Sequence, residues 1–358
     1  MRIGIVTYED PNQWILGKFA RRLVEQLRVM ELEAQLLRAP DPSFDINHHI
    51  IYQNYDDAAS CAIDTLMITH IDTAGKLHLL RRQLETAKLG ICMSRQATQQ
   101  LTQAGIPADR LRYINPAHDE LLAPRKISIG IFNKVHADGR TRNGLLPALA
   151  EQVDLRSFVF NIMGTNWEPT ANALVARGIE VNCYPKFDLD EYRRLLPTLD
   201  YFMYLGLDEG SMAFVDALAA GVKTIATRQG FHLDATDGLT HPFIDLPELV
   251  TIFQSILAER NRPVEAVRRW TWRRYAEKHL ALWQALIEHG SVGASRGEVD
   301  VDDVQIPVIS APAFNWLLLK GSLRNLVHRV RLQRSPRLGY RKMLGKLSRY
   351  AGRGSRSK

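Results

Sequence analysis

A chain of 358 residues with 46% hydrophobic and 24% charged residues has an ordinary globular composition and is long enough for two domains. Its N-terminus, MRIGIVTYED, has no basic segment followed by an apolar run, and no stretch of about 18 apolar residues occurs, which argues against a signal peptide and a membrane span. We therefore expect a cytoplasmic protein. The three cysteines are far apart and odd in number, so we expect buried apolar residues rather than disulfides or a zinc site.

The net charge of +7 is unevenly distributed. Residues 320–358 contain 13 Lys and Arg and no Asp or Glu, so the preceding residues are net acidic. This distribution argues against nucleic-acid binding driven by the overall charge of the folded part. Apolar residues of the tail fall at helical spacing between cations, which predicts an amphipathic helix (Trp316, Leu319, Leu323, Leu326, Val327 and Val330).

Strand-like and helix-like segments alternate from the N-terminus onward. Apolar, β-branched runs at 2–8, 48–55, 65–71 and 87–94 are interrupted by helix-period stretches at 14–30 and 95–105. Such alternation predicts βαβ units around a parallel sheet. The pattern breaks over residues 115–126, where two prolines and short polar residues occur.

A second alternating series follows this break. Strand-like runs are expected at 126–135, 157–164, 179–185, 200–206 and 222–227, with helix-like stretches at 143–153, 171–178, 189–199 and 212–221 between them. The chain therefore predicts two doubly wound α/β domains in succession. Ligands of such sheets bind at the carboxyl ends of the strands, which predicts a cleft between two facing domains.

The remaining segments complete the predicted organisation. We expect a first domain at 1–120, a second at 121–265, a Trp-rich helix at 266–290, a linker at 291–312 and a basic amphipathic tail at 313–358. Asp188 and Asp190 imitate a metal-binding D-x-D motif, but they precede a helix-like stretch. We interpret them as helix N-capping and predict no metal site.

The most informative segment is DEGSMAFVDALAAGV, residues 208–222. The pair Gly210-Ser211 precedes a helix, where unpaired backbone N–H groups and the helix dipole favour an anion such as a diphosphate. Gly210 also permits close backbone approach of a ligand. A second loop, DGRTRNG at 138–144, follows a strand and offers the guanidinium groups of Arg140 and Arg142 for phosphate oxygens.

These two segments resemble those of GT-B glycosyltransferases, and most closely glycosyltransferase family 4, whose members retain the anomeric configuration. Residues 208–222 are similar to the E-x7-E element of that family, with Asp208 and Asp216 at the two acidic positions and Lys223 in place of the usual proline. Residues 139–144 are similar to its G-R…K-G element, with Arg140 at the arginine and Arg142 or Asn143 at the lysine. The resemblance covers residues 2–283 and implies two Rossmann-like domains facing a cleft. It also implies that the Trp-rich helix at 266–290 crosses back to the first domain.

The resemblance also implies roles for individual residues. Asp208 or Glu209 would contact the transferred sugar, Asp216 the ribose, and Arg140, Arg142, Gly210, Ser211 and Met212 the rest of the donor. In the first domain, His70 ends the strand TLMI, where the family often has a histidine near the sugar. Gly17 occupies the place of a Gly-rich acceptor loop.

The sequence therefore predicts a glycosyltransferase that moves a sugar from a nucleoside-diphosphate donor to a carbohydrate or lipid-linked acceptor. The resemblance favours retention without a metal or other cofactor. A non-catalytic carbohydrate-binding or scaffolding relative, and a GT-B epimerase or phosphorylase, remain as alternatives. The tail predicts peripheral contact with an anionic membrane, with a basic tail that docks a partner protein or touches nucleic acid without specificity as the other interpretation.

Overall fold

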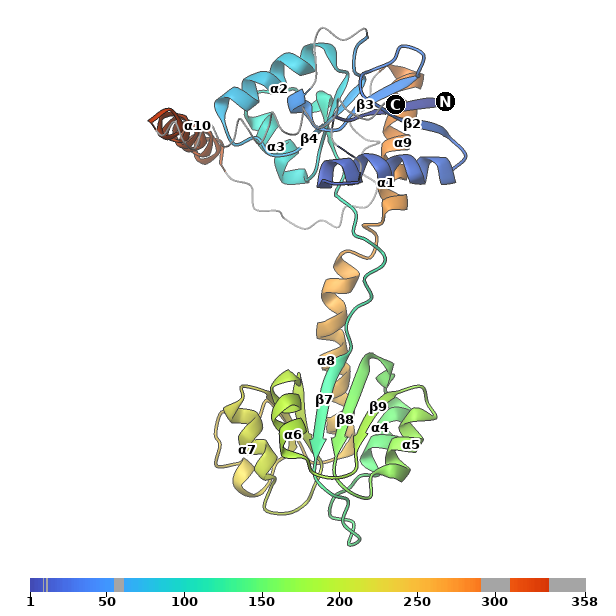
Figure 1. Cartoon of the computed structure of the whole chain (residues 1–358), viewed down its shortest axis with the longest axis vertical. Coiled ribbons are helices and arrows are strands. Elements are labelled where there is room, and N and C mark those ends of the chain that lie inside the picture. Colours follow the sequence, from blue (N-terminus) through green and yellow to red (C-terminus); the bar gives the residue numbers. More distant parts are fainter. Residues whose placement is uncertain (9, 11, 55–60, 291–309, 335–358) are drawn as a thin grey trace, which may run out of the picture. The chain divides into compact units, whose positions relative to one another are not determined.

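The chain folds into two compact units, each with its own parallel sheet and helices (Figure 1). Unit 1 combines the residues up to Asp119 with those from Arg269 on, and unit 2 comprises Glu120–Arg268. The structure is a computed structural model and describes residues 1–8, 10, 12–54, 61–290 and 310–334. Most of the predicted linker at 291–312, and the tail beyond residue 334, lie outside the described residues.

The sheet of unit 1 has six parallel strands in the order β2-β1-β3-β4-β5-β6. In this order β2 lies on one side of β1, whereas β3 and the later strands lie on the other side. The chain therefore has a topological switch point beside β1. All four residues of β3, β4 and β5 are buried, as expected for strands covered on both faces. The strands are β1 (Arg2–Val6), β2 (Glu33–Leu37), β3 (Ile46–His49), β4 (Thr65–Ile68), β5 (Leu89–Cys92) and β6 (Leu111–Tyr113).

Two helices from opposite ends of the sequence lie side by side on this sheet, α1 (Ile15–Val29) and α9 (Trp272–His289) (Figure 1). Thr271 caps the start of α9 by accepting the Arg274 N–H, and Gly290 ends the helix in a left-handed conformation. The apolar face of α9 completes the core of unit 1, with Trp283 fully buried. The remaining helices are α2 (Ala74–Thr86), α3 (Arg95–Gln103) and α10 (Ala311–Arg334).

Two buried histidines, His48 on β3 and His279 on α9, face each other with ring centroids 5.2 Å apart. The Nδ1 of His48 is 2.8 Å from the Thr65 hydroxyl, and that of His279 is 2.9 Å from the Tyr275 carbonyl. Neither Nε2 atom has a hydrogen-bond partner among the described residues. Burial is the main cause that lowers the pKa of both rings, that of His279 to about 4.

Acid is therefore expected to destabilise unit 1. Because the pKa of His279 in the folded state lies below its ordinary value of 6.5, the neutral ring contributes its full stability above pH 6.5, and this contribution falls as the pH drops towards 4. At about pH 5 the expected loss from His279 is about 2 kcal/mol relative to neutral pH. Urea unfolding at the two pH values measures it. His279→Phe cannot take up a proton and should lose correspondingly less stability, so equal losses in both proteins would contradict the assignment.

The sheet of unit 2 also has six parallel strands, in the order β12-β11-β10-β7-β8-β9. This is the doubly wound order of a dinucleotide-binding domain, with its switch point between β7 and β10. The strands are β7 (Ile127–Phe132), β8 (Phe158–Met163), β9 (Glu180–Tyr184), β10 (Tyr201–Tyr204), β11 (Lys223–Thr227) and β12 (His241–Phe243). The helices are α4 (Leu145–Gln152), α5 (Glu168–Val175), α6 (Leu189–Leu195), α7 (Met212–Ala219) and α8 (Leu246–Ala266). The two predicted doubly wound α/β folds are thus confirmed.

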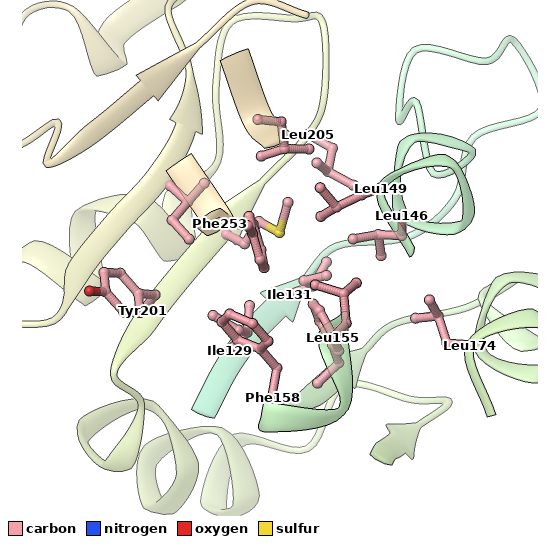
Figure 2. Packing of buried hydrophobic residues seen from close by; sticks show 14 of the residues in the cluster. Ile129, Ile131, Leu146, Leu149, Leu155, Phe158, Leu174, Tyr201, Leu205 and Phe253 are labelled. Carbon is pink, nitrogen blue, oxygen red and sulfur yellow. The ribbon is translucent and has the colours of Figure 1, made fainter. Parts of the chain in front are cut away.

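Aliphatic and aromatic side chains fill the core of unit 2 between the sheet and helices α4, α5 and α8 (Figure 2). Phe253 of α8 packs on Phe158 of β8 with ring centroids 5.0 Å apart, and Ile129 and Ile131 of β7 are fully buried in the same cluster. Asp188 accepts the Glu191 N–H at the start of α6, which confirms its interpretation as an N-cap.

One expectation about the cysteines is wrong. Cys92 on β5 is buried as expected, but Cys61 is only partly buried and Cys183 is exposed. Cys183 lies on β9, the edge strand of unit 2, whose side chains are only partly covered. No helix in the described part of the chain combines the length and hydropathy needed to cross a membrane.

Candidate functional site

The acidic segment that begins at Asp208 follows β10, on one side of the switch point of unit 2. The Asp208 carboxylate accepts hydrogen bonds at Oδ1 from the Tyr204 hydroxyl (2.5 Å) and the Gly210 N–H (3.1 Å). Both bonds reach the same oxygen, which orients the carboxylate and leaves Oδ2 for another donor. Glu209 is exposed, and its carbonyl accepts the Phe231 N–H.

Gly210 occupies a backbone conformation that requires glycine, with φ +122°. A Cβ atom at this position would lie 2.9 Å from the His232 ring. The Ser211 N–H donates to Nε2 of His232 at 3.0 Å, so this nitrogen carries no proton. The His232 ring is completely buried, and burial is the main cause that lowers its pKa and keeps this acceptor available. The buried ring therefore holds the chain in place where α7 begins.

Helix α7 starts at Met212 without a capping side chain, because Ser211 at the N-cap position makes no side-chain hydrogen bond to it. The first N–H groups of a helix lack partners within the helix, and the helix dipole makes this end positive. Met212 is exposed beside it. The start of α7 can therefore accept an anionic ligand.

Asp216 lies one turn further along α7 and is exposed. Its Oδ2 accepts the hydroxyl of Tyr192, from α6, at 2.6 Å. Burial, followed by the bond to this carboxylate, raises the pKa of Tyr192, and the same causes raise that of Tyr204 beside Asp208. Both tyrosines therefore remain protonated donors that orient the two carboxylates at neutral pH.

A pocket of about 520 Å³ opens at the carboxyl ends of β7 and β8, beside α6 and α7. Its walls include Ser211, Met212 and Asp216, together with Lys134 from the loop after β7 and Tyr192. The pocket has the size and place expected for a small-molecule site in a doubly wound domain. Lys134 and Tyr192 are site residues that the sequence reasoning missed.

The two arginines of the loop after β7 lie in different surroundings. Arg140 is exposed, 2.7 Å from Nδ1 of His136 and 3.5 Å from the Asp138 carboxylate. Its carbonyl accepts the N–H of Leu207, the residue before Asp208, at 2.8 Å. This bond joins the two predicted donor-binding segments across the switch point, although Arg140 does not line the pocket.

Arg142, in contrast, is directed towards the end of β12. It donates to the Ile244 carbonyl at 2.8 Å and lies over the Phe243 ring, 5.8 Å from its centroid. Burial lowers its pKa, and its Nη2 has no partner among the described residues. The structure thus gives Arg142 a role in anchoring its own loop, whose backbone at this residue is left-handed with φ 50°.

In unit 1, His70 follows β4, and its Nε2 lies 3.0 Å from the Lys76 ammonium. An ammonium group has only donors, so this nitrogen is the acceptor of that contact. Lys76 also pairs with Asp72 at 2.6 Å. The sequence analysis expected Gly17 in an acceptor loop. In the structure this residue is instead buried in the first turn of α1, because the helix begins before it at Ile15.

The pocket of unit 2 offers hydroxyl, carboxylate and ammonium groups. Among the described residues, no three His, Cys, Asp or Glu side chains gather as a metal-ion site would require.

Comparison with known proteins places glycosyltransferases among the solved structures that this chain resembles. No protein-family model and no curated protein sequence matches it. HepE from Anabaena, solved with UDP-glucose, is 11% identical over 78% of this chain and 99% of its own, with a TM-score of 0.32. Sucrose-phosphate synthase from Thermosynechococcus elongatus is 12% identical over 80% of this chain and 99% of its own, with a TM-score of 0.33.

A third neighbour is the catalytic domain of the cholesterol-alpha-glucosyltransferase from Helicobacter pylori, which is 17% identical over 44% of this chain and 98% of its own, with a TM-score of 0.32. These likenesses are distant, and they do not assign a reaction to this chain.

Proposed function

We propose that this chain is a glycosyltransferase that binds a nucleoside-diphosphate sugar in unit 2 and transfers the sugar to a carbohydrate or lipid-linked acceptor. The proposal rests mainly on the hydrogen bond from the Leu207 N–H to the Arg140 carbonyl. This bond holds the arginine loop beside the acidic segment at the switch point, where a doubly wound sheet binds its ligand. One nucleotide can then meet a cation, a helix start and two oriented carboxylates.

In this proposal the diphosphate lies between Arg140, Lys134 and the N-terminal end of α7. A guanidinium grips phosphate oxygens in pairs, an ammonium supplies a point charge, and the helix adds backbone donors. Asp216, oriented by Tyr192, accepts hydrogen bonds from the ribose hydroxyls. Asp208 or Glu209 accepts those of the sugar.

The proposed chemistry is retaining and needs no metal ion. The leaving diphosphate takes the proton from the acceptor hydroxyl on the same face of the sugar, so the C–O bond to the acceptor forms as the bond to the phosphate oxygen breaks. Cations and helix N–H groups stabilise the developing charge on the diphosphate, which is the usual main electrostatic contribution to catalysis. His70, whose Nε2 lies 3.0 Å from the Lys76 ammonium, is proposed to contact the transferred sugar.

Two alternatives are separated from this proposal by the products formed. A non-catalytic carbohydrate-binding or scaffolding relative would bind nucleotide sugars without turnover. An epimerase or phosphorylase would use the same donor pocket, but incubation with a labelled donor would yield an epimer or a sugar phosphate instead of a glycosylated acceptor.

The Arg140→Ala variant tests the donor site directly. Removal of a charge-assisted hydrogen bond to phosphate is expected to weaken UDP-glucose or GDP-mannose binding by about 1.5–3 kcal/mol, roughly tenfold to a hundredfold in Kd. Isothermal titration calorimetry measures the change in the full-length protein.

Arg156→Ala is the matched control, because this exposed arginine of unit 2 has Asp154 as its sole ion-pair partner among the described residues. Its nucleotide affinity should equal that of the unmodified protein. Unchanged affinity in the Arg140→Ala protein, with folding intact, would rule out the proposed diphosphate contact.

We further propose that the outer face of α10 lies on an anionic membrane at the cytoplasmic side. Large apolar side chains on this face are exposed, with Trp316 60% and Leu326 59% accessible, and Leu319, Leu323 and Val327 beside them. Apolar side chains can enter the headgroup region while neighbouring cations contribute about 1 kcal/mol each at the surface. Such contact would hold the enzyme near a lipid-linked acceptor.

A double substitution, Trp316→Ser with Leu323→Ser, tests this contact without disturbing the core. Full-length protein is expected to float with phosphatidylglycerol-containing vesicles at low salt, and the double variant to bind them at least tenfold more weakly. Val175→Ser with Leu233→Ser removes two comparably exposed apolar side chains from unit 2 and should leave vesicle binding intact. Equal binding by both double variants would contradict the proposed membrane face.

A further inference from the structure

Helix α10 is seated on unit 1 by its inner face. Phe314 and Leu318, one turn apart, are buried in a cluster with side chains of α2 and α3 such as Leu80 and Leu101. Gly321 lies so close to the loop between β4 and α2 that a Cβ atom would be 1.9 Å from the Asp72 carbonyl oxygen. The described part of the basic C-terminal segment therefore belongs to the fold of unit 1.

A hydrogen bond also holds α10 on unit 1. The Ser322 hydroxyl accepts the N–H of Ala74, the first residue of α2, at 3.3 Å. The helix thus meets the loop that carries His70 with a glycine and a small polar residue. Larger side chains at these two positions would hold α10 away from that loop.

The seated helix forms one wall of a pocket of about 400 Å³ at the end of β4. The loop after β4 contributes Thr69 and His70, and α3 contributes Gln100. From α10 come Lys320, Arg324 and Asn325. Hydroxyl, amide and imidazole groups suit the hydroxyls of a saccharide, and the apolar part of the wall, which includes Phe314, suits its C–H groups.

The charge of this pocket is positive. Arg324 follows Lys320 by four positions, so the two side chains lie on the same side of α10. Neither makes an ion pair among the described residues, whereas Asp72, the acid of the pocket, is paired with Lys76 at 2.6 Å. Two cations that make no ion pair within the described part of the chain thus line a pocket that also contains His70.

We propose that this pocket binds the acceptor and that the acceptor is a saccharide or polyol carrying a phosphate group. A phosphate monoester has a charge of about −1.5 to −2 at neutral pH, which two cations balance, whereas a carboxylate would leave one of them unpaired. Arg324 can bind two phosphate oxygens at once, with Lys320 as a second charge. That the bound molecule is an acceptor rests on the proposed transferase function. Its binding to the pocket can be tested without turnover.

The test is calorimetric titration of the full-length protein with glucose 1-phosphate, glucose 6-phosphate and glucose. At least one sugar phosphate is expected to bind tenfold or more tightly than glucose. In a second arm, vesicles whose negative charge comes from phosphatidylglycerol, or in equal amount from phosphatidylinositol 4-phosphate, distinguish a lipid-borne phosphate monoester from a soluble one. The Lys320→Ala/Arg324→Ala protein should lose tenfold or more of the affinity for whichever phosphate binds.

A charge-matched control is Lys88→Ala/Arg156→Ala, which removes two exposed cations that already have acidic partners and should bind as the unmodified protein does. Gly321→Ala keeps both cations but displaces α10 from Asp72, so it should also weaken sugar-phosphate binding. Gly75→Ala on α2, where the added Cβ meets nothing within 4 Å, should not.

Failure of every phosphate probe to bind, or equal binding by the Lys320→Ala/Arg324→Ala protein, would overturn the proposal. UDP-glucose titration of the same variants separates this result from the donor site. The Lys320→Ala/Arg324→Ala protein should bind UDP-glucose normally, and the Arg140→Ala protein should bind sugar phosphates normally. A protein that binds sugar phosphates but no nucleotide sugar would retain the pocket assignment and lose the proposed function.

Discussion

The Trp283→Ala variant is expected to lose about 3–5 kcal/mol of unfolding free energy, because a completely buried indole leaves a large cavity. Trp283 packs within the cluster that joins α1, α9 and the sheet of unit 1. Its Nε1–H also donates to the Thr65 hydroxyl at 3.0 Å. Urea unfolding followed by circular dichroism measures the loss, and hydrogen exchange should locate it in α9 and the strands beneath it.

Trp316→Ala provides the control, since this indole of α10 is 60% accessible. A substitution at such a position is expected to change stability by no more than about 0.5 kcal/mol. Comparable losses in the two variants would mean that α9 is not an integral part of the core of unit 1.

Gly164→Ala is expected to damage both the stability and the nucleotide pocket of unit 2. The residue has φ +147°, and a Cβ atom would lie 2.1 Å from the Asn133 carbonyl oxygen at the end of β7. Strained backbone and forced separation of two strand ends together suggest a loss of about 2–5 kcal/mol. Because Gly164 and Asn133 both line the pocket, UDP-glucose binding should fall at least tenfold.

Gly178→Ala separates the two causes. This glycine also has a left-handed backbone, with φ +75°, but nothing lies within 4 Å of the added Cβ. It should cost only about 1–2 kcal/mol and leave nucleotide binding unchanged. If Gly164→Ala costs no more than this control, the close approach of β7 and β8 does not constrain the pocket.

The elements of the fold could be predicted from hydrophobic patterning because parallel strands are buried on both faces. The run ISIGIF of β7 and the helical spacing of α9 are both evident in the sequence. Strand order could not be obtained in this way, since a buried apolar run has the same composition whichever strand lies beside it. The switch point between β7 and β10 therefore required the structure.

The candidate donor site was predictable where its residues are close together in the sequence. Residues 208–216 and Arg140 belong to local motifs, but Tyr192, His232 and Lys134 reach the site from separate elements. Tyr204 had a usable signal, because it lies in a predicted strand, four residues before Asp208. No spacing rule connects the other three to the motif, so only the folded chain identifies them.

Helix α10 has two apolar faces, and only one of them could be predicted from the sequence pattern. The stripe that contains Trp316 and Leu323 dominates the helical spacing, yet these side chains are exposed. The face that contacts unit 1 consists of only a few side chains, chiefly Phe314 and Leu318, with Gly321. Periodicity reports that a helix is apolar on one side, but it does not report which side meets the protein.

The return of the chain from unit 2 to α9 has a consequence for synthesis on the ribosome. Strands β1 to β6 emerge first, but the apolar surface that receives Trp272, Tyr275 and Trp283 stays open until α9 has been made. At about 5–20 residues per second, translation of the intervening unit takes roughly 7–30 s. Unit 2, which is continuous in sequence, can complete its folding within that interval, so we expect the nascent chain to bury its second core before its first.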